Sequence, residues 1–521
     1  MTITNAKSLQ VVWFKRDLRL HDHEPLTRAA ARGPTLPLHI VEPDLWQQPD
    51  MSGRQFAFLR ESLMDLREQL GRIGQPLIIR AGDALTCLDE IHRIHGIETL
   101  WSHEETGNGW TFERDLAVLD WCRQQGIAWQ EIPQFGVIRR LKNRRGWAGR
   151  WDRFMARPAA TAPIGLTPLS KVEPGPMPEA HEIGIASDPC PERFRGGRTA
   201  GLDELGSFLR DRGEPYQKAM SGPLTAFDGC SRISAHLTFG TVSMRETFQA
   251  ARRRQAELHE LPGDKRGKWP GAIRSFLARL HWHCHFMQKL EDEPEIEFRC
   301  FHPAYEGLRE ENAEAVERWA TGQTGLPFVD ACMRALNAHG WINFRMRAML
   351  VSFASYHLWL PWRSTGEPLA RMFTDYEPGI HWSQMQMQSA TTGINLPRIY
   401  NPIKQGRDFD KDGAFIRRWV PELQVVPEAY IHEPRLWPEA ESALKGRYPQ
   451  PIVEERVARK LAQEKIWGVR REPGYREIAD AIQMKHGSRK SGIPQHERKA
   501  DTARRKQQAG QGIQLSLLAS D

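Results

Sequence analysis

The first part of the chain alternates short apolar runs with segments of helical periodicity. The runs LQVVWF, TLPLHIVE, PLIIRAG, ETLWSHE and AWQEIP are rich in β-branched and aromatic residues, and each predicts a strand. The clearest helical segment between them carries one apolar stripe, whose members recur at steps of three and four: Phe56, Leu59, Leu63, Leu66, Leu70 and Ile73. Strands alternating with helices predict a doubly wound parallel sheet, an α/β domain over residues 8–135. No G-x-G-x-x-G follows the first strand, which argues against a nicotinamide dehydrogenase.

The pattern changes twice beyond this domain. Residues 136–200 include the proline-rich stretch RPAATAPIGLTPLSKVEPGPMPEAHE, which has little periodicity and predicts an interdomain linker on the surface. Residues 201–485 are helical in pattern nearly throughout and predict an all-α domain. Residues 486–521 are polar and basic until their end, and we expect them to form a disordered tail.

Composition and charge narrow the class of protein. With 521 residues, 40% of them hydrophobic, the chain can bury the cores of two or more domains. A net charge of +7 favours a polyanionic partner such as nucleic acid, although a basic protein without one is the alternative. The seven cysteines include no C-x-x-C pair, so we interpret them as reduced thiols. This pattern argues against a zinc site or an iron–sulfur cluster. We find neither a signal-peptide profile nor an apolar stretch of membrane length, so we expect a cytoplasmic protein without a membrane anchor. We also expect a monomer.

An apolar run near the middle of the helical part contains two arginines. The segment GWINFRMRAMLVSFASYHLWLPW spans residues 340–362 and carries Arg345 and Arg347. Two positions apart on a helix, these side chains point about 200° from each other, so at most one can lie squarely on the buried face. A buried guanidinium requires an anion, and Asp375 and Glu377 are the nearest downstream candidates. One interpretation of these residues is an ion pair that only stabilises the fold. An ion pair that takes part in function is the other, and it requires further evidence from the sequence.

Four separated blocks supply that context. They are VVWFKRDLRLHDHEPLTRA (11–29), CSRISAHLTFGTVSMRE (230–246), TGLPFVDACMRALNAHGWINFRMR (324–347) and RIYNPIKQGRDFDKDGAFIRRWVPEL (398–423). In this order they resemble the photolyase/cryptochrome flavoprotein family, and the resemblance extends over about residues 8–470. It implies an N-terminal α/β antenna domain and a C-terminal helical domain that holds FAD. Arg347 matches the arginine that pairs with the acidic residue beside the flavin, here Asp375.

The resemblance also implies a set of cofactor-binding residues: Tyr216, Ser231, Arg232, Ile233, Ser234, Phe276, Arg279, Arg347, Asp375, Tyr376 and Glu377. The two serines offer hydroxyl donors at a turn or helix start, which suits a pyrophosphate, and helix capping is a compatible alternative. On the DNA side it implies Trp282, Arg345 and Gln405. Trp282 matches a tryptophan that stacks on a flipped base pair, and its alternative role is core packing.

Several positions depart from the family pattern. Arg279 stands where a lesion-binding carboxylate is typical, and Phe344 stands where an asparagine is expected. The eukaryotic-type (6-4) photolyase pair of histidines is missing, and the absence of cysteines beyond Cys332 argues against the iron–sulfur branch. The segment SHEETGNGWTFERD does not single out one antenna chromophore, so folate and deazaflavin both stay open.

The electron relay of the family is altered as well. Trp362 matches its middle tryptophan, but the innermost position is Met385 and the outermost is Arg309. Trp382 and Trp359 are candidate substitutes in this catalytic set. His381 falls at the position that faces the flavin N5 atom, where it acts either as a proton donor or as a core histidine.

Together these observations predict a light-driven DNA photolyase that splits UV-induced pyrimidine dimers by electron transfer from excited, reduced FAD. The alternatives are a cryptochrome-type blue-light receptor that binds FAD without repair and a flavoprotein that binds nucleic acid in the dark. The peptide QLSLL, Gln514–Leu518, is similar to the peptide that docks bacterial repair proteins on the sliding clamp, and a chance apolar terminus is the other reading.

Overall fold

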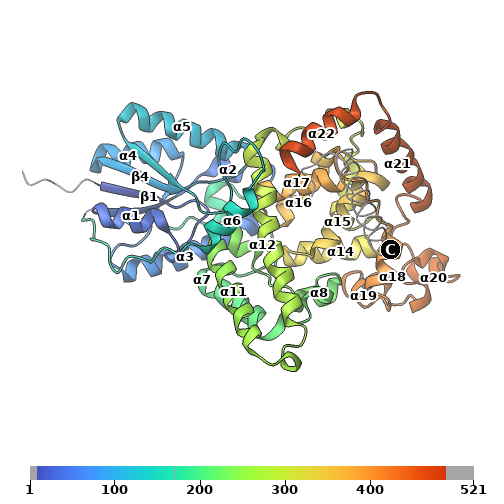
Figure 1. Cartoon of the computed structure of the whole chain (residues 1–521). Coiled ribbons are helices and arrows are strands. Elements are labelled where there is room, and N and C mark those ends of the chain that lie inside the picture. The colour runs from blue at the N-terminus through green and yellow to red at the C-terminus, as the bar shows by residue number, and fades with distance from the viewer. Residues whose placement is uncertain (1–8, 171, 488–521) are drawn as a thin grey trace, which may run out of the picture.

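The computed structural model describes residues 9–170 and 172–487, and it divides the chain into an α/β half and a helical half (Figure 1). Both predicted fold classes are confirmed. In Figure 1 the sheet and its helices lie on one side, and the long helix α12 (Trp269–Asp292) runs beside the junction of the two halves. Among the described residues, no helix has the length and apolar character that a membrane span requires.

The sheet has five parallel strands in the order β3-β2-β1-β4-β5. All five predicted runs form strands: β1 (Leu9–Trp13), β2 (Thr35–Val41), β3 (Ile78–Ala81), β4 (Ile97–His103) and β5 (Ala128–Ile132). The direction of winding reverses between β1 and β4, so the carboxyl ends of these two strands open a crevice at the switch point.

Helices cover the sheet and connect its strands. They are α1 (Glu24–Arg32), α2 (Pro43–Trp46), α3 (Gly53–Arg72), α4 (Ala84–His95) and α5 (Gly109–Gln125). The predicted apolar stripe lies on α3, where every member from Phe56 to Leu70 is buried. The side chains of Asp83 and Asn108 accept backbone N–H groups of α4 and α5, which satisfies donors that a helix start leaves free.

The range expected to be an irregular linker contains a helix. Helix α6 (Trp147–Ala156) buries Trp147, Trp151 and Met155, which recur at steps of four, and a 3₁₀ turn follows at Ala180–Ile183. The proline-rich stretch beyond α6 is attached to the α/β half, since the Ile79 N–H donates to the carbonyl of Pro174 at 2.8 Å. Arg67 donates to the same carbonyl at 3.1 Å. This segment therefore covers the outer edge of β3, which would otherwise expose unpaired backbone groups.

The helical half contains no strand among its described residues. Its α-helices are α7 (Arg198–Ser207), α8 (Tyr216–Ala219), α9 (Pro223–Gly229), α10 (Ser234–Thr238), α11 (Met244–Glu260), α12, α13 (Ala313–Ala320), α14 (Pro327–His339), α15 (Phe344–Ser352), α16 (Trp362–Met372), α17 (Pro378–Gln388), α18 (Pro402–Phe409), α19 (Ala414–Trp419), α20 (Ala440–Leu444), α21 (Glu455–Val469) and α22 (Tyr475–His486). Two π-helical turns, Phe208–Arg212 and Phe353–His357, extend α7 and α15. Short 3₁₀ turns connect the others: Gly263–Lys265, Pro294–Glu297, Pro303–Tyr305, Pro421–Leu423, Glu428–Tyr430 and Pro434–Leu436.

The two halves share one hydrophobic core, to which β1, α3, α10 and α12 all contribute. The loop after β1 packs directly on Gly240, where an added Cβ would lie 2.5 Å from the Cα of Asp17. Gly240 has a φ of +65°, a conformation that also favours glycine. Arg54 of α3 binds Asp188 and donates to the carbonyls of Asn337 and Met372. These contacts hold the helical half against the sheet.

Candidate functional site

The predicted arginine–aspartate pair forms at the start of α15. The Arg347 Nη2 atom lies 2.9 Å and 3.1 Å from the two carboxylate oxygens of Asp375, and Nε donates to the carbonyl of Ile342 at 2.7 Å. The guanidinium also lies 4.0 Å from the ring centre of Phe373. The Asp375 side chain is only 4% exposed, so this is a nearly buried charge whose partner is fixed from three sides.

Arg345 lies on another side of the same helix, as the helical geometry predicts. Its guanidinium packs 4.8 Å from the ring centre of Phe409 on α18. Its Nε atom is buried without a hydrogen-bond partner, and the same holds for Oε1 of Gln405 on α18. Two unsatisfied polar atoms from neighbouring helices mark a place where a further polar group can bind, because a buried unpaired donor or acceptor is costly.

The turn between α9 and α10 has the form expected of a cradle for an anionic group. Arg212 donates to the carbonyls of Cys230 and Ser231 and fixes the turn, while Arg232 adopts a left-handed backbone with a φ of +56°. Ile233 is buried in the shared core. The Ser234 Oγ and Arg232 Nε atoms are buried and have no partner among the described residues. The Arg232 guanidinium lies between the rings of Phe194, Phe227 and Trp341, at 4.6, 5.5 and 5.6 Å.

Tyr216 and Phe276 form an aromatic wall next to this turn. The two rings are 6.5 Å apart and each packs against Phe208. Burial raises the pKa of the Tyr216 phenol, so this hydroxyl stays protonated. Arg279, one turn further along α12, is exposed, and its guanidinium lies 5.5 Å from the ring centre of Phe344.

Trp282 is an exposed aromatic side chain. It is 40% exposed, its ring stacks on Phe286 at 5.6 Å, and the edge of His285 supports it at 5.0 Å. Phe344, which lies beside Arg279, is 50% exposed. Because residues three apart on a helix are neighbours, Arg279 and Trp282 present a cation and an aromatic face on the same side of α12.

Tyr376 and Glu377 are turned toward the α/β half. The Tyr376 hydroxyl donates to Asp50 at 2.5 Å, and Asn108 donates to the same carboxylate. Glu377 lies 3.5 Å from Arg16, and burial raises the pKa of its carboxyl to about 7. The structure thus places these two predicted cofactor residues at the junction of the halves, next in sequence to Asp375.

His381 lies among aromatic rings on α17. Its ring packs edge-on against Tyr376 at 5.2 Å and Trp382 at 4.8 Å. Its Nε2 atom contacts the carbonyl of Gly366 at 2.9 Å, and because a carbonyl only accepts, this nitrogen carries the proton. Burial lowers the pKa of His381 to about 3, so the imidazole is neutral.

The predicted relay residues fall into two groups. Trp382 and Trp362 are both buried and their ring centres are 5.7 Å apart. Trp359 is half-buried and lies between two cations, with Lys465 at 4.6 Å and Arg309 at 4.9 Å from its ring centre. Arg309 itself is held by the carbonyls of Ser355 and Ser389. A positive charge on the Trp359 indole would therefore be repelled from both sides.

Sequence reasoning missed a hollow at the switch point of the sheet. It is lined by residues that follow β1 and β4, among them Lys15, Arg16, Glu105 and Gly107, and by Tyr376 of the helical half. The order of the predicted strands could have indicated its position, since ligands of doubly wound sheets bind at the carboxyl ends of the strands where the direction of winding reverses. Nearby, Asp17 accepts hydrogen bonds from His23 and His103 at 2.9 and 2.7 Å. The other ring nitrogen of His23 accepts the Leu26 N–H, which marks this cluster as structural.

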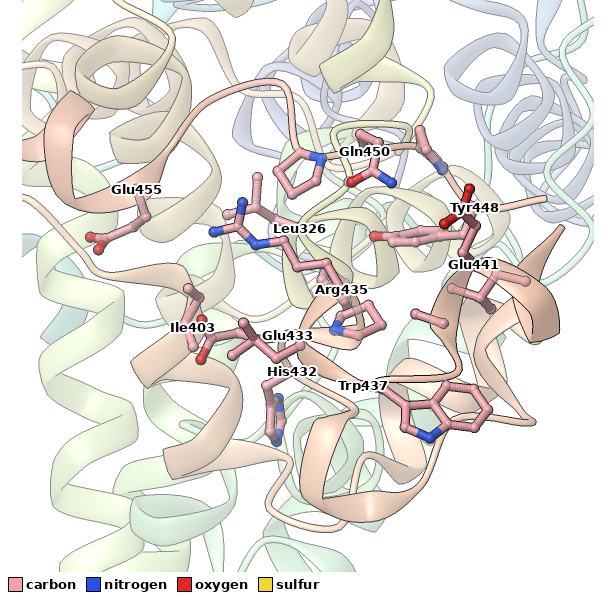
Figure 2. A pocket seen from close by; sticks show the side chains of 18 of the residues that line it. Leu326, Ile403, His432, Glu433, Arg435, Trp437, Glu441, Tyr448, Gln450 and Glu455 are labelled. Atoms are coloured by element: carbon pink, nitrogen blue, oxygen red, sulfur yellow. The ribbon is translucent and has the colours of Figure 1, made fainter. Parts of the chain in front are cut away.

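A groove of about 660 Å³ opens elsewhere in the helical half, between α18, α20 and the segment that follows α20 (Figure 2). Ile403, Arg435, Trp437 and Tyr448 are among its lining residues. Two of its acids are paired, Glu433 with Arg407 and Glu455 with Arg459. None of the predicted site residues lines this groove, so we do not place the functional site there.

The comparisons with known proteins agree with this arrangement. A family model described as DNA photolyase matches residues 10–137, and one described as the FAD-binding domain of DNA photolyase matches residues 276–468. A cryptochrome DASH of Gloeobacter violaceus is 30% identical over 493 residues, which cover 85% of this chain and 93% of that protein. The chain belongs to the photolyase/cryptochrome family. Its helical half is an FAD-binding domain of that family.

Other members of the photolyase/cryptochrome family carry both kinds of name. A deoxyribodipyrimidine photo-lyase of Escherichia coli is 28% identical over 476 residues, 86% of this chain and 96% of that enzyme. A solved class III photolyase of Agrobacterium tumefaciens has a TM-score of 0.77 at 25% identity and covers 91% of this chain and 100% of its own. An archaeal photolyase of Sulfolobus tokodaii, solved with two FAD molecules, has a TM-score of 0.73 at 25% identity, with 88% and 100% covered. Family membership therefore leaves repair and light sensing as two candidate functions.

Proposed function

We propose that the protein is a light-driven DNA photolyase that splits UV-induced pyrimidine dimers by electron transfer from excited, reduced FAD. The observation that carries the proposal is the set of buried polar atoms without partners near the Arg347–Asp375 pair: Arg232 Nε, Ser234 Oγ and Asn343 Oδ1. Asn343 precedes α15, and Arg232 packs on Trp341, so these atoms belong to one neighbourhood.

These residues fit an FAD molecule. Ser234 and Arg232 would donate to its pyrophosphate, and the isoalloxazine ring would lie beside the hydrogen-bonded Arg347–Asp375 pair. Tyr216 and Phe276 would line the same cavity. When bound and reduced, FAD supplies the electron that light promotes to the dimer. The protein would contribute binding and orientation, and His381 would be a neutral group near the ring.

The substrate side of the proposal depends on two exposed aromatic side chains. Trp282 and Phe344 offer faces on which unstacked pyrimidines can rest. Arg279, which stands where a carboxylate is typical, only donates hydrogen bonds, so it would bind carbonyl or phosphate oxygens. Arg345 and Gln405 would contact the DNA backbone, which makes affinity sensitive to salt.

A cryptochrome-type receptor is the second candidate, and the departures at Arg279 and Phe344 favour it. The two candidates predict different results with purified protein and UV-irradiated oligonucleotides. A photolyase removes cyclobutane or (6-4) products under blue light and leaves them intact in the dark, as chromatography of the digested DNA would measure. A receptor binds FAD and removes neither product in either condition. A colourless chain that took up no FAD on reconstitution would contradict both.

We also propose that the hollow at the switch point holds the second, antenna chromophore, a folate or a deazaflavin. Its position between the sheet and Tyr376 would bring such a chromophore next to the FAD-binding half. The test is to denature the purified protein and identify the released chromophores by absorption and mass. Release of FAD alone, after expression in a host that makes both candidates, would contradict this assignment.

The remaining predictions concern the chain as a whole. We propose domain limits at 8–135, 136–200 and 201–485, a monomeric state and a cytoplasmic location.

The tail 486–521 and its peptide Gln514–Leu518 lie almost wholly outside the described residues. If that peptide binds the sliding clamp, deletion of residues 512–521 should abolish co-elution with the clamp, and unchanged co-elution would end the idea.

A further inference from the structure

The tryptophan pair Trp362 and Trp382 contacts a thiol through Trp362. The indole Nε1–H of Trp362 donates to the Sγ atom of Cys300 at 3.3 Å. Cys300 is the only one of the seven cysteines that is not buried. Its backbone N–H donates to the carboxylate of Glu306 at 2.5 Å, and Glu306 is exposed to solvent. Trp362, Cys300 and Glu306 thus form a continuous series from the core to the surface.

We propose that Cys300 is the terminal electron donor of the relay, so that electrons reach the FAD site along Cys300, Trp362 and Trp382. This inference rests on the proposed function, because it requires FAD beside Trp382. Where the outermost relay position is a tryptophan, its indole is the third member of the relay. In this chain a thiol would take that role. Here that position is Arg309, which cannot give up an electron.

Electrostatics favour this direction. Trp382 packs against His381 at 4.8 Å and against Trp362 at 5.7 Å, so the two indoles connect the FAD side of α17 with α16. The guanidinium of Arg363 lies 5.7 Å from the ring centre of Trp382. A cation at this distance destabilises a positive charge on that indole, and the charge is driven outward to Trp362.

The other candidate for the third member is Trp359, and its surroundings oppose the role. Lys465 lies 4.6 Å and Arg309 lies 4.9 Å from its ring centre. Two cations raise the free energy of an oxidised indole between them, whereas at Cys300 the carboxylate of Glu306 acts more strongly than the Arg309 guanidinium. Oxidation therefore stops at the sulfur and does not pass to Trp359.

The step balances in electrons and protons. One electron passes from the Cys300 sulfur to the oxidised Trp362 indole, and the thiol proton passes to the Glu306 carboxylate. The products are a neutral indole, a sulfur-centred radical and a carboxylic acid that exchanges its proton with water. An external thiol then returns a hydrogen atom to the sulfur. Burial and Glu306 raise the pKa of Cys300 to about 12, so the thiol holds its proton before the step.

The experiment compares FAD-loaded wild type with Cys300→Ser, Cys300→Ala, Trp362→Phe and, as a control, Cys87→Ser, a cysteine of the α/β half. Flash photolysis without added thiol measures the lifetime of the oxidised tryptophan. We expect both Cys300 variants to lengthen it at least tenfold and Cys87→Ser to leave it unchanged. Glu306→Gln should lengthen it as well, because the proton acceptor is lost.

A second readout locates the radical on the chain and does not depend on a kinetic signal. A radical trap is added during illumination, and peptide mass mapping locates its adduct. We expect the adduct on the peptide that contains Cys300 in wild type and its loss in Trp362→Phe. Wild-type lifetimes in both Cys300 variants, or an adduct confined to Trp359, would overturn the inference and leave the proposed function intact. A chain that bound no FAD would overturn both.

Discussion

At the scale of single residues, the site combines buried charge with unsatisfied polar atoms. Asp375 is 4% exposed, and its carboxylate is held by one guanidinium. Such a pair adds little to stability by itself, since desolvation offsets the attraction. The pair instead fixes a cation and a carboxylate side by side. A flavin ring, which has both hydrogen-bond donors and acceptors, could bind to both groups.

We expect Asp375→Asn to lower FAD affinity at least tenfold, about 1.4 kcal/mol. The substitution keeps the shape of the side chain and removes the charge that balances Arg347. Asp408→Asn is the control, because Asp408 belongs to an exposed pair with Lys404 on α18. FAD content per protein, read from absorption after gel filtration, measures the effect. Equal content in both variants would show that the pair does not hold the cofactor.

Trp282→Ala tests the DNA side of the proposal. Loss of a base-stacking indole costs about 1–3 kcal/mol, so we expect affinity for a dimer-containing oligonucleotide to fall about tenfold or more. Trp467→Ala is a matched control, because Trp467 is 39% exposed against 40% for Trp282 and lies on α21. Fluorescence anisotropy at fixed salt gives both affinities. A similar loss in the two variants would mean that Trp282 has no special contact with the lesion.

At the scale of elements, the helices and strands that position the site were largely predictable. Strong local patterns, such as the apolar runs of β1 to β5 and the stripe of α3, indicate the type of each element without knowledge of its long-range contacts. Helix α6 was missed because it is only ten residues long and lies in a range that is otherwise rich in proline. Tyr376 and Glu377 were assigned to the cofactor from their place beside Asp375. Their partners Asp50 and Arg16 lie more than 300 residues away, and no local pattern contains that contact.

Helix α3 carries the contact that joins the two halves. Arg54 is 7% exposed in its side chain and donates to Asp188 and to two carbonyls of the helical half. We expect Arg54→Ala to destabilise the protein by about 3 kcal/mol, because it leaves the Asp188 carboxylate without its cation and two carbonyls without their donor. Arg60→Ala, on the same helix, removes only a surface pair with Glu179 and should cost about 0.5 kcal/mol. Denaturant midpoints at neutral pH compare the two, and equal losses would contradict the role of Arg54.

At the scale of the whole molecule, many titratable groups are buried between and within the two halves. Burial lowers the pKa of seven histidines to about 4 or less: His39, His103, His236, His283, His285, His381 and His486. Burial also raises the pKa of Glu42, Glu104, Glu297 and Glu377 to about 7 and lowers that of Lys289 to about 7. As pH falls, the histidines and the carboxyls change the stability in opposite directions.

The signs follow from which state binds the proton. A histidine with a lowered pKa stays neutral when folded but binds a proton below about pH 6.5 when unfolded, so stability is lost as pH falls from about 6.5. The four carboxyls take up protons in the folded state as pH falls below about 7, while the unfolded chain does not, and stability is gained. Lys289 has the same sign as the histidines: its unfolded form already holds a proton below about pH 10, so stability is lost as pH falls toward 7 and does not change further below it. Since the histidines are more numerous, we expect a net loss of stability between pH 7.5 and pH 5.5.

His236 isolates one part of this balance. It lies on α10, is 1% exposed, packs against Phe58 of the α/β half and has its pKa lowered to about 4. Wild type should therefore lose about 1.3 kcal/mol between pH 7.5 and pH 5.5 through this residue alone. His236→Gln cannot bind that proton, so its loss over the same interval should be smaller by this amount, whatever the variant's absolute stability. His259→Gln, at an exposed position on α11, should keep the wild-type dependence. Parallel pH profiles for wild type and His236→Gln would show that this histidine is charged in the folded protein.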